Sequence, residues 1–286
     1  MSANTKRLPD FIGIGAMRCG TTWISDQLRS HPDIHIPPHY KEVHFFDRYY
    51  DKGMDWYLSN FSGRADHQIA GEFTPYYVRD AVAMTRLSQD CPDAKLILAI
   101  RNPVERAWSH YKFLKNRKSV SSSFFETLHD ERFEILEAGR YGAQLQRCLE
   151  LFPKDQICII SFDEIKASPE RTISKLYSFL EVDTDYKPEA PRTKSNAGHA
   201  VRSMFLARIL RLAKQLVRPF TSGRRGIMRL GFFKFGKMIN RLNATAVDQV
   251  EMDEDVLAFL NEYYLEDLTL LAELVGKEVK LWELHK

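Results

Sequence analysis

One stretch near the start of the chain, FIGIGAMRCGTTW at residues 11–23, constrains the fold more than any other. Its apolar beginning predicts a buried strand, two glycines open a loop, and Thr21 and Thr22 begin a helical pattern that continues through Leu28. Glycines let a backbone approach an anion closely, and the first turn of a helix offers unpaired N–H groups at the positive end of its dipole. The stretch therefore predicts a strand–loop–helix unit that binds phosphate.

The loop is similar to a nucleotide P-loop in spacing but not in its basic residue. Gly15 and Gly20 have the expected separation, yet Thr21 stands where the P-loop lysine is expected. A basic residue, Arg18, lies inside the loop instead. An ordinary tight turn between strand and helix is the alternative, but the mid-loop arginine and the pair of threonines favour an anion site.

Strand and helix patterns alternate along the rest of the chain. We expect strands or extended segments at 34–36, 68–73, 95–100 and 156–162, and helices at 81–88, 104–115, 124–138, 141–152, 170–180, 201–217 and 253–275. The run KLILAI at 95–100 is typical of a central parallel strand that is covered on both faces. The order predicts an α/β protein with a P-loop-like three-layer fold, in which helices flank a central parallel sheet. We expect one domain over residues 1–286, with 190–247 as a basic helical insertion or cap.

An arginine follows the central strand at the position where ligands bind in open α/β sheets. Such ligands lie beyond the carboxyl ends of the strands, so Arg101 is placed to meet an anion, and Ser109 lies two turns into the next helix. A nucleotide hydrolase often has an aspartate here to hold magnesium. The arginine favours phosphate binding by guanidinium and hydroxyl groups rather than by a metal, although a surface ion pair is the alternative. Asp163 and Glu164, after the strand at 156–162, keep a magnesium-dependent NTPase open.

The segment KEVHFFD at residues 41–47 combines charged and apolar residues. Glu42 and His44 are two apart, so on an extended segment they face the same side. A carboxylate and an imidazole on one face can act as a general base and its orienting neighbour. The alternative is a solvated edge above buried Phe45 and Phe46.

Positive charge is concentrated in one part of the chain. Of the 41 lysines and arginines, 13 lie between residues 190 and 247, where there is no aspartate or glutamate. A basic amphipathic segment can lie on a membrane surface or bind an acidic polymer, and the alternative is a helical subdomain with solvated charges.

The four cysteines are far apart and form no C-x-x-C pair, which argues against a zinc site or a disulfide framework. The polar start of the chain resembles no signal peptide, and no apolar run approaches the roughly 20 residues of a membrane span. We therefore expect a cytoplasmic protein with reduced cysteines.

Taken together, these segments resemble the PAPS-dependent sulfotransferase family, in particular its bacterial and heparan-sulfate-type members. PAPS is 3′-phosphoadenosine 5′-phosphosulfate, the sulfuryl donor. GAMRCGTTW resembles the family's 5′-phosphosulfate loop, KEVHFFD the segment that follows it, GEFTPYY the next core strand, and RNPVERAWSHY the 3′-phosphate motif. The segment from Arg140 to Ile165 and a terminal helix ending at Trp282 also fit the family pattern.

The resemblance implies metal-independent, in-line transfer of a sulfuryl group from PAPS to a hydroxyl or amine. The catalytic residues that it implies are Glu42 as general base, His44 as its neighbour, and Arg18, which stands where the family usually has a lysine. Arginine keeps the charge of that lysine but cannot give up a proton. The donor-binding residues that it implies are Arg18, Cys19, Gly20, Thr21, Thr22 and Trp23 for the 5′ end, Arg101 and Ser109 for the 3′-phosphate, and Lys194 in a loop that closes over the nucleotide.

The acceptor is less defined by the sequence. Family members sulfate glycans, lipids, peptides and small molecules. We expect a glycan, a lipid or a small molecule as acceptor, no nucleic-acid partner, and peripheral membrane contact through residues 200–245. Two alternatives stay open at this point. One is a P-loop kinase or NTPase, and the other is a non-catalytic module that binds an anionic surface through residues 190–247.

Overall fold

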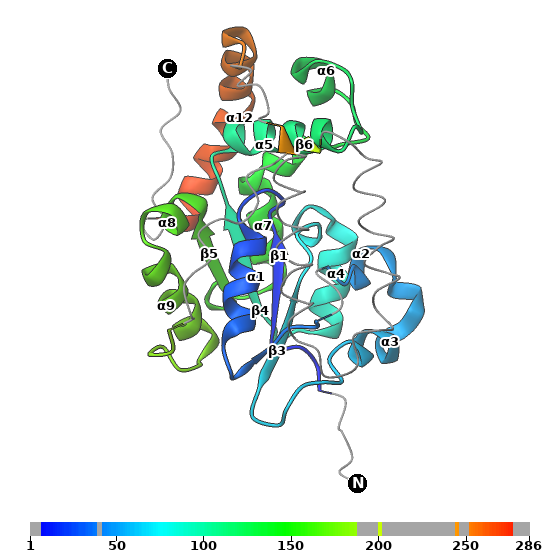
Figure 1. The fold of residues 1–286 in the computed structure, drawn as a ribbon, viewed down its shortest axis with the longest axis vertical. Coiled ribbons are helices and arrows are strands. Elements are labelled where there is room, and N and C mark those ends of the chain that lie inside the picture. The colour runs from blue at the N-terminus through cyan, green and yellow to red at the C-terminus, as the bar shows by residue number, and fades with distance from the viewer. Residues whose placement is uncertain (1–6, 39–41, 188–199, 202–243, 246–251, 277–286) are drawn as a thin grey trace, which may run out of the picture.

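A five-stranded parallel sheet forms the centre of the protein (Figure 1). The computed structural model describes residues 7–38, 42–187, 200–201, 244–245 and 252–276. The strands are β1 (Phe11–Gly15), β2 (Ile34–His35), β3 (Ile69–Phe73), β4 (Lys95–Ile100) and β5 (Ile157–Ser161), and their order in the sheet is β2-β3-β1-β4-β5. All neighbouring pairs are parallel. The expected central parallel sheet is therefore confirmed.

Helices cover the sheet on both sides. They are α1 (Thr21–Ser30), α2 (Phe45–Arg48), α3 (Gly53–Ser59), α4 (Ala81–Asp90), α5 (Pro103–Asn116), α6 (Phe124–Leu128), α7 (Tyr141–Leu151), α8 (Phe162–Ala167), α9 (Pro169–Leu180) and α12 (Glu254–Val275). In Figure 1, α8 and α9 lie to the left of the strands, and α2, α3 and α4 lie to the right. Every side chain from Leu96 to Ile100 in β4 is fully buried, as a strand covered on both faces requires.

Side-chain caps fix where α4 and α5 begin. Asp80 accepts hydrogen bonds from the N–H groups of Val82 and Ala83 at the start of α4. Asn102 does the same for the start of α5, where Pro103 occupies the first turn. Because Asn102 comes two residues after β4 ends, α5 begins directly beside the carboxyl end of that strand.

The long helix α12 packs closely on α7. The carboxylate of Asp267 accepts hydrogen bonds from the N–H groups of Gly142 (2.8 Å) and Ala143 (2.9 Å), which lie in the first turn of α7. A Cβ atom on Gly142 would lie 2.3 Å from the Asp267 carbonyl oxygen, so only glycine fits this approach. None of the helices in the described parts of the chain is both long and apolar enough to cross a bilayer.

The helix expected at 124–138 is wrong beyond its first turns. Only α6, Phe124–Leu128, is α-helical there, and a 3₁₀ turn follows at Glu137–Gly139. The side chain of Asp130 accepts hydrogen bonds from both the backbone N–H and the guanidinium of Arg132, which stabilises a turn. Glu134 has a φ of 47°, outside the right-handed helical region. These local interactions compete with the helix that the apolar spacing predicts.

The basic segment lies almost wholly outside the described residues. Within it the structure describes only two short strands, β6 (Ala200–Val201) and β7 (Ala244–Thr245), which pair antiparallel. The start of the helix expected at 201–217 is therefore wrong, because Val201 is part of a strand. The rest of that helix, Lys194 and Trp282 fall outside the described residues.

Candidate active site

The predicted phosphate loop connects β1 to α1. Gly20 precedes the helix with a φ of 89°, a left-handed conformation that favours glycine. Glycine has no side chain with which to cap the helix, so the first-turn N–H groups of α1 keep their hydrogen-bonding capacity for another partner. These donors and the positive end of the helix dipole make the loop suitable for an anion.

Arg18 connects this loop to α5. Its Nε donates a hydrogen bond to Oγ of Ser109 at 3.2 Å, and its guanidinium lies 4.8 Å from the ring centroid of Phe113. Burial and the neighbouring Arg101 lower the pKa of Arg18 from its ordinary value. Two residues predicted for opposite ends of a donor, Arg18 and Ser109, are therefore in direct contact.

Further cations surround this contact. Arg101 binds Glu105, with 2.8 Å between Nη2 and Oε2, and its guanidinium lies over the ring of Phe162. Burial, and then the charges of Arg101 and Arg18, lower the pKa of Lys112, which shows that three cations share one region. Sequence reasoning missed Lys112, although its place one helical turn after Ser109 was an available signal.

Two basic side chains of α5 are buried. Arg106 is fully buried and donates a hydrogen bond from Nη2 to the carbonyl oxygen of Ile135. Burial, and then the charges of Arg106 and Arg18, lower the pKa of His110 to about 3, so its ring is neutral at neutral pH. Positive charge in this part of α5 thus comes from arginine and lysine rather than from histidine.

The side chains of Cys19 and Trp23, two residues predicted to bind the donor, are buried in the core. The Cys19 thiol is 3.3 Å from the hydroxyl of Tyr141, and burial raises its pKa to about 11. A buried neutral thiol behaves as a small apolar side chain. Donor binding by these two residues stays a prediction.

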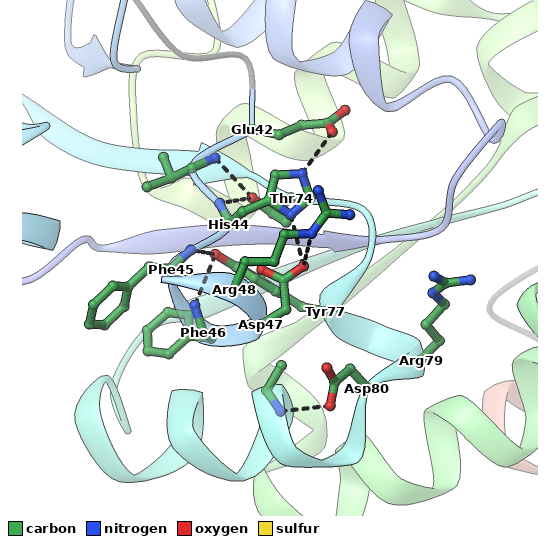
Figure 2. A network of polar contacts seen from close by, with 12 residues as sticks. Glu42, His44, Phe45, Phe46, Asp47, Arg48, Thr74, Tyr77, Arg79 and Asp80 are labelled. Carbon is green, nitrogen blue, oxygen red and sulfur yellow. Dashed lines mark hydrogen bonds and ion pairs between the residues drawn. The ribbon is translucent and has the colours of Figure 1, made fainter. Parts of the chain in front are cut away.

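Glu42, His44 and Asp47 form a continuous chain of hydrogen bonds (Figure 2). The His44 ring contacts Oδ2 of Asp47 through Nδ1 at 2.8 Å and Oε2 of Glu42 through Nε2 at 3.2 Å. Burial alone favours the neutral ring, but the hydrogen bonds to Asp47 and Glu42 outweigh it and raise the pKa of His44 to about 9. The imidazole is therefore protonated at neutral pH and donates to both carboxylates.

The expected pairing of Glu42 with His44 is present, and so is the packing offered as its alternative. Phe45 and Phe46 are both buried beneath these hydrogen-bonded side chains. Sequence reasoning missed Asp47, although a residue three positions after His44 at the start of a helix lies within reach of that side chain.

Cations also lie beside His44. The ring of Tyr76 is 5.4 Å from that of His44, and the guanidinium groups of Arg48 and Arg79 lie 5.3 Å and 4.6 Å from the Tyr76 centroid. Arg79 also forms an ion pair with Glu134. Arg48 in turn forms an ion pair with Asp47, so the two arginines beside His44 are each paired with a carboxylate.

Asp163 and Glu164, the acidic residues that left a magnesium-dependent NTPase as an alternative, make local contacts. Glu164 accepts a hydrogen bond from the N–H of Ser161 in a capping box at the start of α8, and Asp163 forms an ion pair with Lys166. Within the described ranges, no group of three or more histidine, cysteine, aspartate or glutamate side chains is arranged to hold a metal ion. Metal independence itself stays a prediction.

Comparisons with known proteins agree on one family. A model of the sulfotransferase domain matches residues 8–197. Human heparan sulfate glucosamine 3-O-sulfotransferase 3B1 is 34% identical over 188 residues, which cover 62% of this chain and 47% of that protein. The membrane-associated sulfotransferase kil1 of Dictyostelium discoideum is 27% identical over 279 residues, which cover 65% of this chain and 59% of that protein. The chain spans about half the length of the curated relatives that it matches.

A solved structure supports the fold. The sulfotransferase from Alicyclobacillus acidocaldarius superimposes with a TM-score of 0.69 at 24% identity, covering 96% of this chain and 98% of that one. At this identity the likeness shows the fold alone. The domain match spans the phosphate loop, the KEVHFFD stretch at residues 41–47 (the Glu42 segment) and the Arg101–Ser109 motif. The chain belongs to the sulfotransferase domain family.

Proposed function

We propose that this chain transfers a sulfuryl group from PAPS to an acceptor hydroxyl or amine. One observation carries the proposal: three chemically distinct stretches meet at one edge of the sheet. The phosphate loop follows β1, Arg101 follows β4, and the Glu42 segment is hydrogen-bonded to Thr74, directly after β3. Because β3, β1 and β4 are adjacent and parallel, their carboxyl ends lie together, where α/β proteins bind ligands.

The residues at this edge fit a donor with phosphate at both ends. The N-terminus of α1 and Arg18 suit the 5′-phosphosulfate, and Arg101 with Ser109 suits the 3′-phosphate. Bound PAPS would supply the sulfuryl group and an adenosine 3′,5′-bisphosphate leaving group. In this arrangement the Arg18–Ser109 contact links the two phosphate subsites.

The hydrogen-bonded series Glu42–His44–Asp47 suits removal of a proton from the acceptor. Glu42 accepts the proton as the acceptor oxygen or nitrogen attacks sulfur, while protonated His44, held by Asp47, orients the Glu42 carboxylate. Arg18 stabilises the negative charge that grows on the leaving oxygen and, as an arginine, does so without donating a proton.

A glycan is the acceptor class that we favour. Relatives at about a third identity are named as enzymes acting on the glucosamine of heparan sulfate. Arg48 and Arg79, whose guanidinium groups both lie over the ring of Tyr76 beside His44, would favour an acceptor that carries negative charge. A cytoplasmic location, membrane contact through residues 200–245 and the absence of a nucleic-acid partner stay predictions.

Calorimetric titration tests the donor assignment directly. The protein is titrated with adenosine 3′,5′-bisphosphate in EDTA and, separately, with ATP and magnesium. We expect tight binding of the bisphosphate without metal. Binding of ATP only, and only with magnesium, would contradict the proposal. Incubation with PAPS and a panel of glycan, lipid and small-molecule acceptors, read by mass spectrometry, then identifies the acceptor class.

A further inference from the structure

A buried carboxylate lies behind the Glu42 segment, and the proposed reaction gives it no role. Glu72, near the end of β3, is 1% exposed. Its Oε2 accepts a hydrogen bond of 2.6 Å from the hydroxyl of Thr74, and its Oε1 accepts one of 2.9 Å from the hydroxyl of Tyr77. A carboxylate so deeply buried is costly unless it is hydrogen-bonded, and here each of its oxygens has a donor.

The same two hydroxyl groups hold the backbone of the Glu42 segment (Figure 2). Thr74 Oγ1 accepts from the N–H groups of Val43 (3.1 Å) and His44 (3.2 Å). The Tyr77 hydroxyl accepts from the N–H groups of Phe45 (2.8 Å) and Phe46 (3.4 Å). Four consecutive amides, all between Glu42 and Asp47, are therefore tied to two side chains.

The hydrogen bonds in this network have a fixed direction. A hydroxyl has one proton to donate, and its oxygen accepts with its lone pairs. Since both oxygens accept backbone N–H groups, the single proton of each hydroxyl points to Glu72. Burial raises the pKa of Glu72 to about 7, and the hydrogen bonds from Thr74 and Tyr77 oppose that rise. The network thus matches a carboxylate and would be disturbed by an amide, which presents N–H groups to one of the hydroxyl oxygens.

The network also explains an unusual local backbone. His44 has a φ of 55° and directly precedes α2 as its N-cap residue, and its side chain makes no capping hydrogen bond to the helix. The amides at the start of a helix need outside acceptors, and the Tyr77 hydroxyl supplies one for the first two residues of α2. With the backbone fixed on both sides of His44, its ring meets Glu42 on one side and Asp47 on the other.

We infer that Glu72 is a positioning residue, which acts through Thr74 and Tyr77 to hold Glu42 and His44 in their reactive arrangement. The inference rests on the proposed function, because it assigns Glu42 and His44 to proton removal. It predicts a specific kinetic pattern. Loss of a hydroxyl should lower kcat while leaving donor binding unchanged, since the phosphate loop and Arg101 are on other strands.

Thr74 offers a matched pair of variants for the test. Thr74→Val keeps the branched shape and removes the hydroxyl, whereas Thr74→Ser keeps the hydroxyl. A displacement of about 1 Å in a reacting group can cost on the order of 10²-fold in rate, so we expect Thr74→Val and Tyr77→Phe to lower kcat by about 10- to 100-fold. Thr74→Ser should stay within about threefold of wild type, and so should Tyr177→Phe, which removes a buried hydroxyl from α9.

Hydrogen exchange gives a second measurement that does not depend on turnover. We expect the amides of residues 43–46 to exchange slowly in the wild-type protein and faster in Thr74→Val and Tyr77→Phe. A wild-type protein that shows this protection but transfers no sulfuryl group would contradict the proposed function and leave the network intact. Glu72→Gln should resemble Thr74→Val, and the Thr74 and Tyr77 variants carry the test if it does not fold.

Two results would overturn the inference. One is a kcat for Thr74→Val and Tyr77→Phe equal to that of an active wild-type enzyme. The other is a loss of kcat in Thr74→Ser as large as in Thr74→Val, because keeping the hydroxyl would then not keep the activity, and the loss could not be assigned to the hydroxyl. In each assay, calorimetric titration with adenosine 3′,5′-bisphosphate counts the folded sites, so kcat refers to folded protein only.

Discussion

The Nε atom of Arg18 donates a hydrogen bond of 3.2 Å to Oγ of Ser109, and this contact joins the phosphate loop to α5. The two residues are 91 positions apart in the sequence. In the proposed reaction they bind opposite ends of the donor, so a substitution of either residue is expected to affect the position of the other.

Arg18 is expected to contribute charge rather than a proton. Arg18→Ala should lower kcat by about 10²–10³-fold, the usual cost of removing one group that stabilises transition-state charge. Arg18→Lys keeps the charge but loses the fork that reaches Ser109, so we expect a loss of no more than about tenfold. Steady-state kinetics with PAPS checks both, with Arg132→Ala, an exposed arginine paired with Asp130, as control. Equal losses of kcat in Arg18→Ala and Arg18→Lys would show that the geometry of the side chain matters more than its charge.

Glu105 is expected to weaken donor binding. Its Oε2 lies 2.8 Å from Nη2 of Arg101, so an incoming 3′-phosphate must compete with a carboxylate already on that guanidinium. Exposed ion pairs of this kind are weak, so Glu105→Gln should tighten binding of adenosine 3′,5′-bisphosphate by about two- to fivefold. Arg101→Ala should weaken it by about tenfold or more, because charged hydrogen bonds to the phosphate are lost. Calorimetry measures both, and an unchanged affinity in Arg101→Ala would remove Arg101 from the 3′-phosphate site.

The sequence predicted those parts of the site that depend on local spacing. Glu42 and His44 are two residues apart, and their side chains do meet. The continuous apolar run of β4 and the proline after Asn102 fixed the place of Arg101 beside α5. Period, caps and strand ends act over a few residues, so they can be seen in the sequence itself.

The parts that could not be predicted depend on contacts between distant segments. Cys19 meets Tyr141 across 122 positions, and that contact turns a loop cysteine into a core residue. Thr74 and Tyr77 reach the Glu42 segment across about 30 positions. Before the strands are ordered in a sheet, no spacing rule shows which hydroxyl will lie behind which amide.

His44 is expected to titrate well above an ordinary histidine. Its pKa in the folded protein is about 9, because Asp47 and Glu42 outweigh the effect of burial. A raised pKa means that His44 stabilises the fold fully below its unfolded pKa of about 6.5, and that this stability is lost as pH rises through about 9. NMR titration of the imidazole, assigned with His44→Gln, should give this midpoint, and Asp47→Asn should lower it. A midpoint near 6.5 in the wild-type protein would rule out an imidazole ring that is hydrogen-bonded to both carboxylates.

Asp267 is expected to stabilise the fold by capping α7 from α12. Its carboxylate accepts from the N–H groups of Gly142 and Ala143, so Asp267→Ala removes a cap and leaves two donors without this partner. We expect a loss of about 2 kcal/mol in the free energy of unfolding. Gly142→Ala should cost about 1–3 kcal/mol, because its methyl group would meet the Asp267 carbonyl. Urea denaturation measures both, and an exposed control, Glu131→Ala, should change stability by less than about 0.5 kcal/mol.

Glu42 is expected to matter for turnover and not for donor binding. A general base contributes about 10²–10⁴-fold, so Glu42→Gln, which cannot accept a proton but keeps the shape, should lower kcat on that scale. The affinity for adenosine 3′,5′-bisphosphate should stay near the wild-type value, because the cations at Arg18 and Arg101 are untouched. Glu126→Gln, in an exposed capping box of α6, is the matched control. Turnover in Glu42→Gln close to that of the control would remove Glu42 from the role of base, whereas a joint loss of turnover and bisphosphate binding would point to a structural role for the segment.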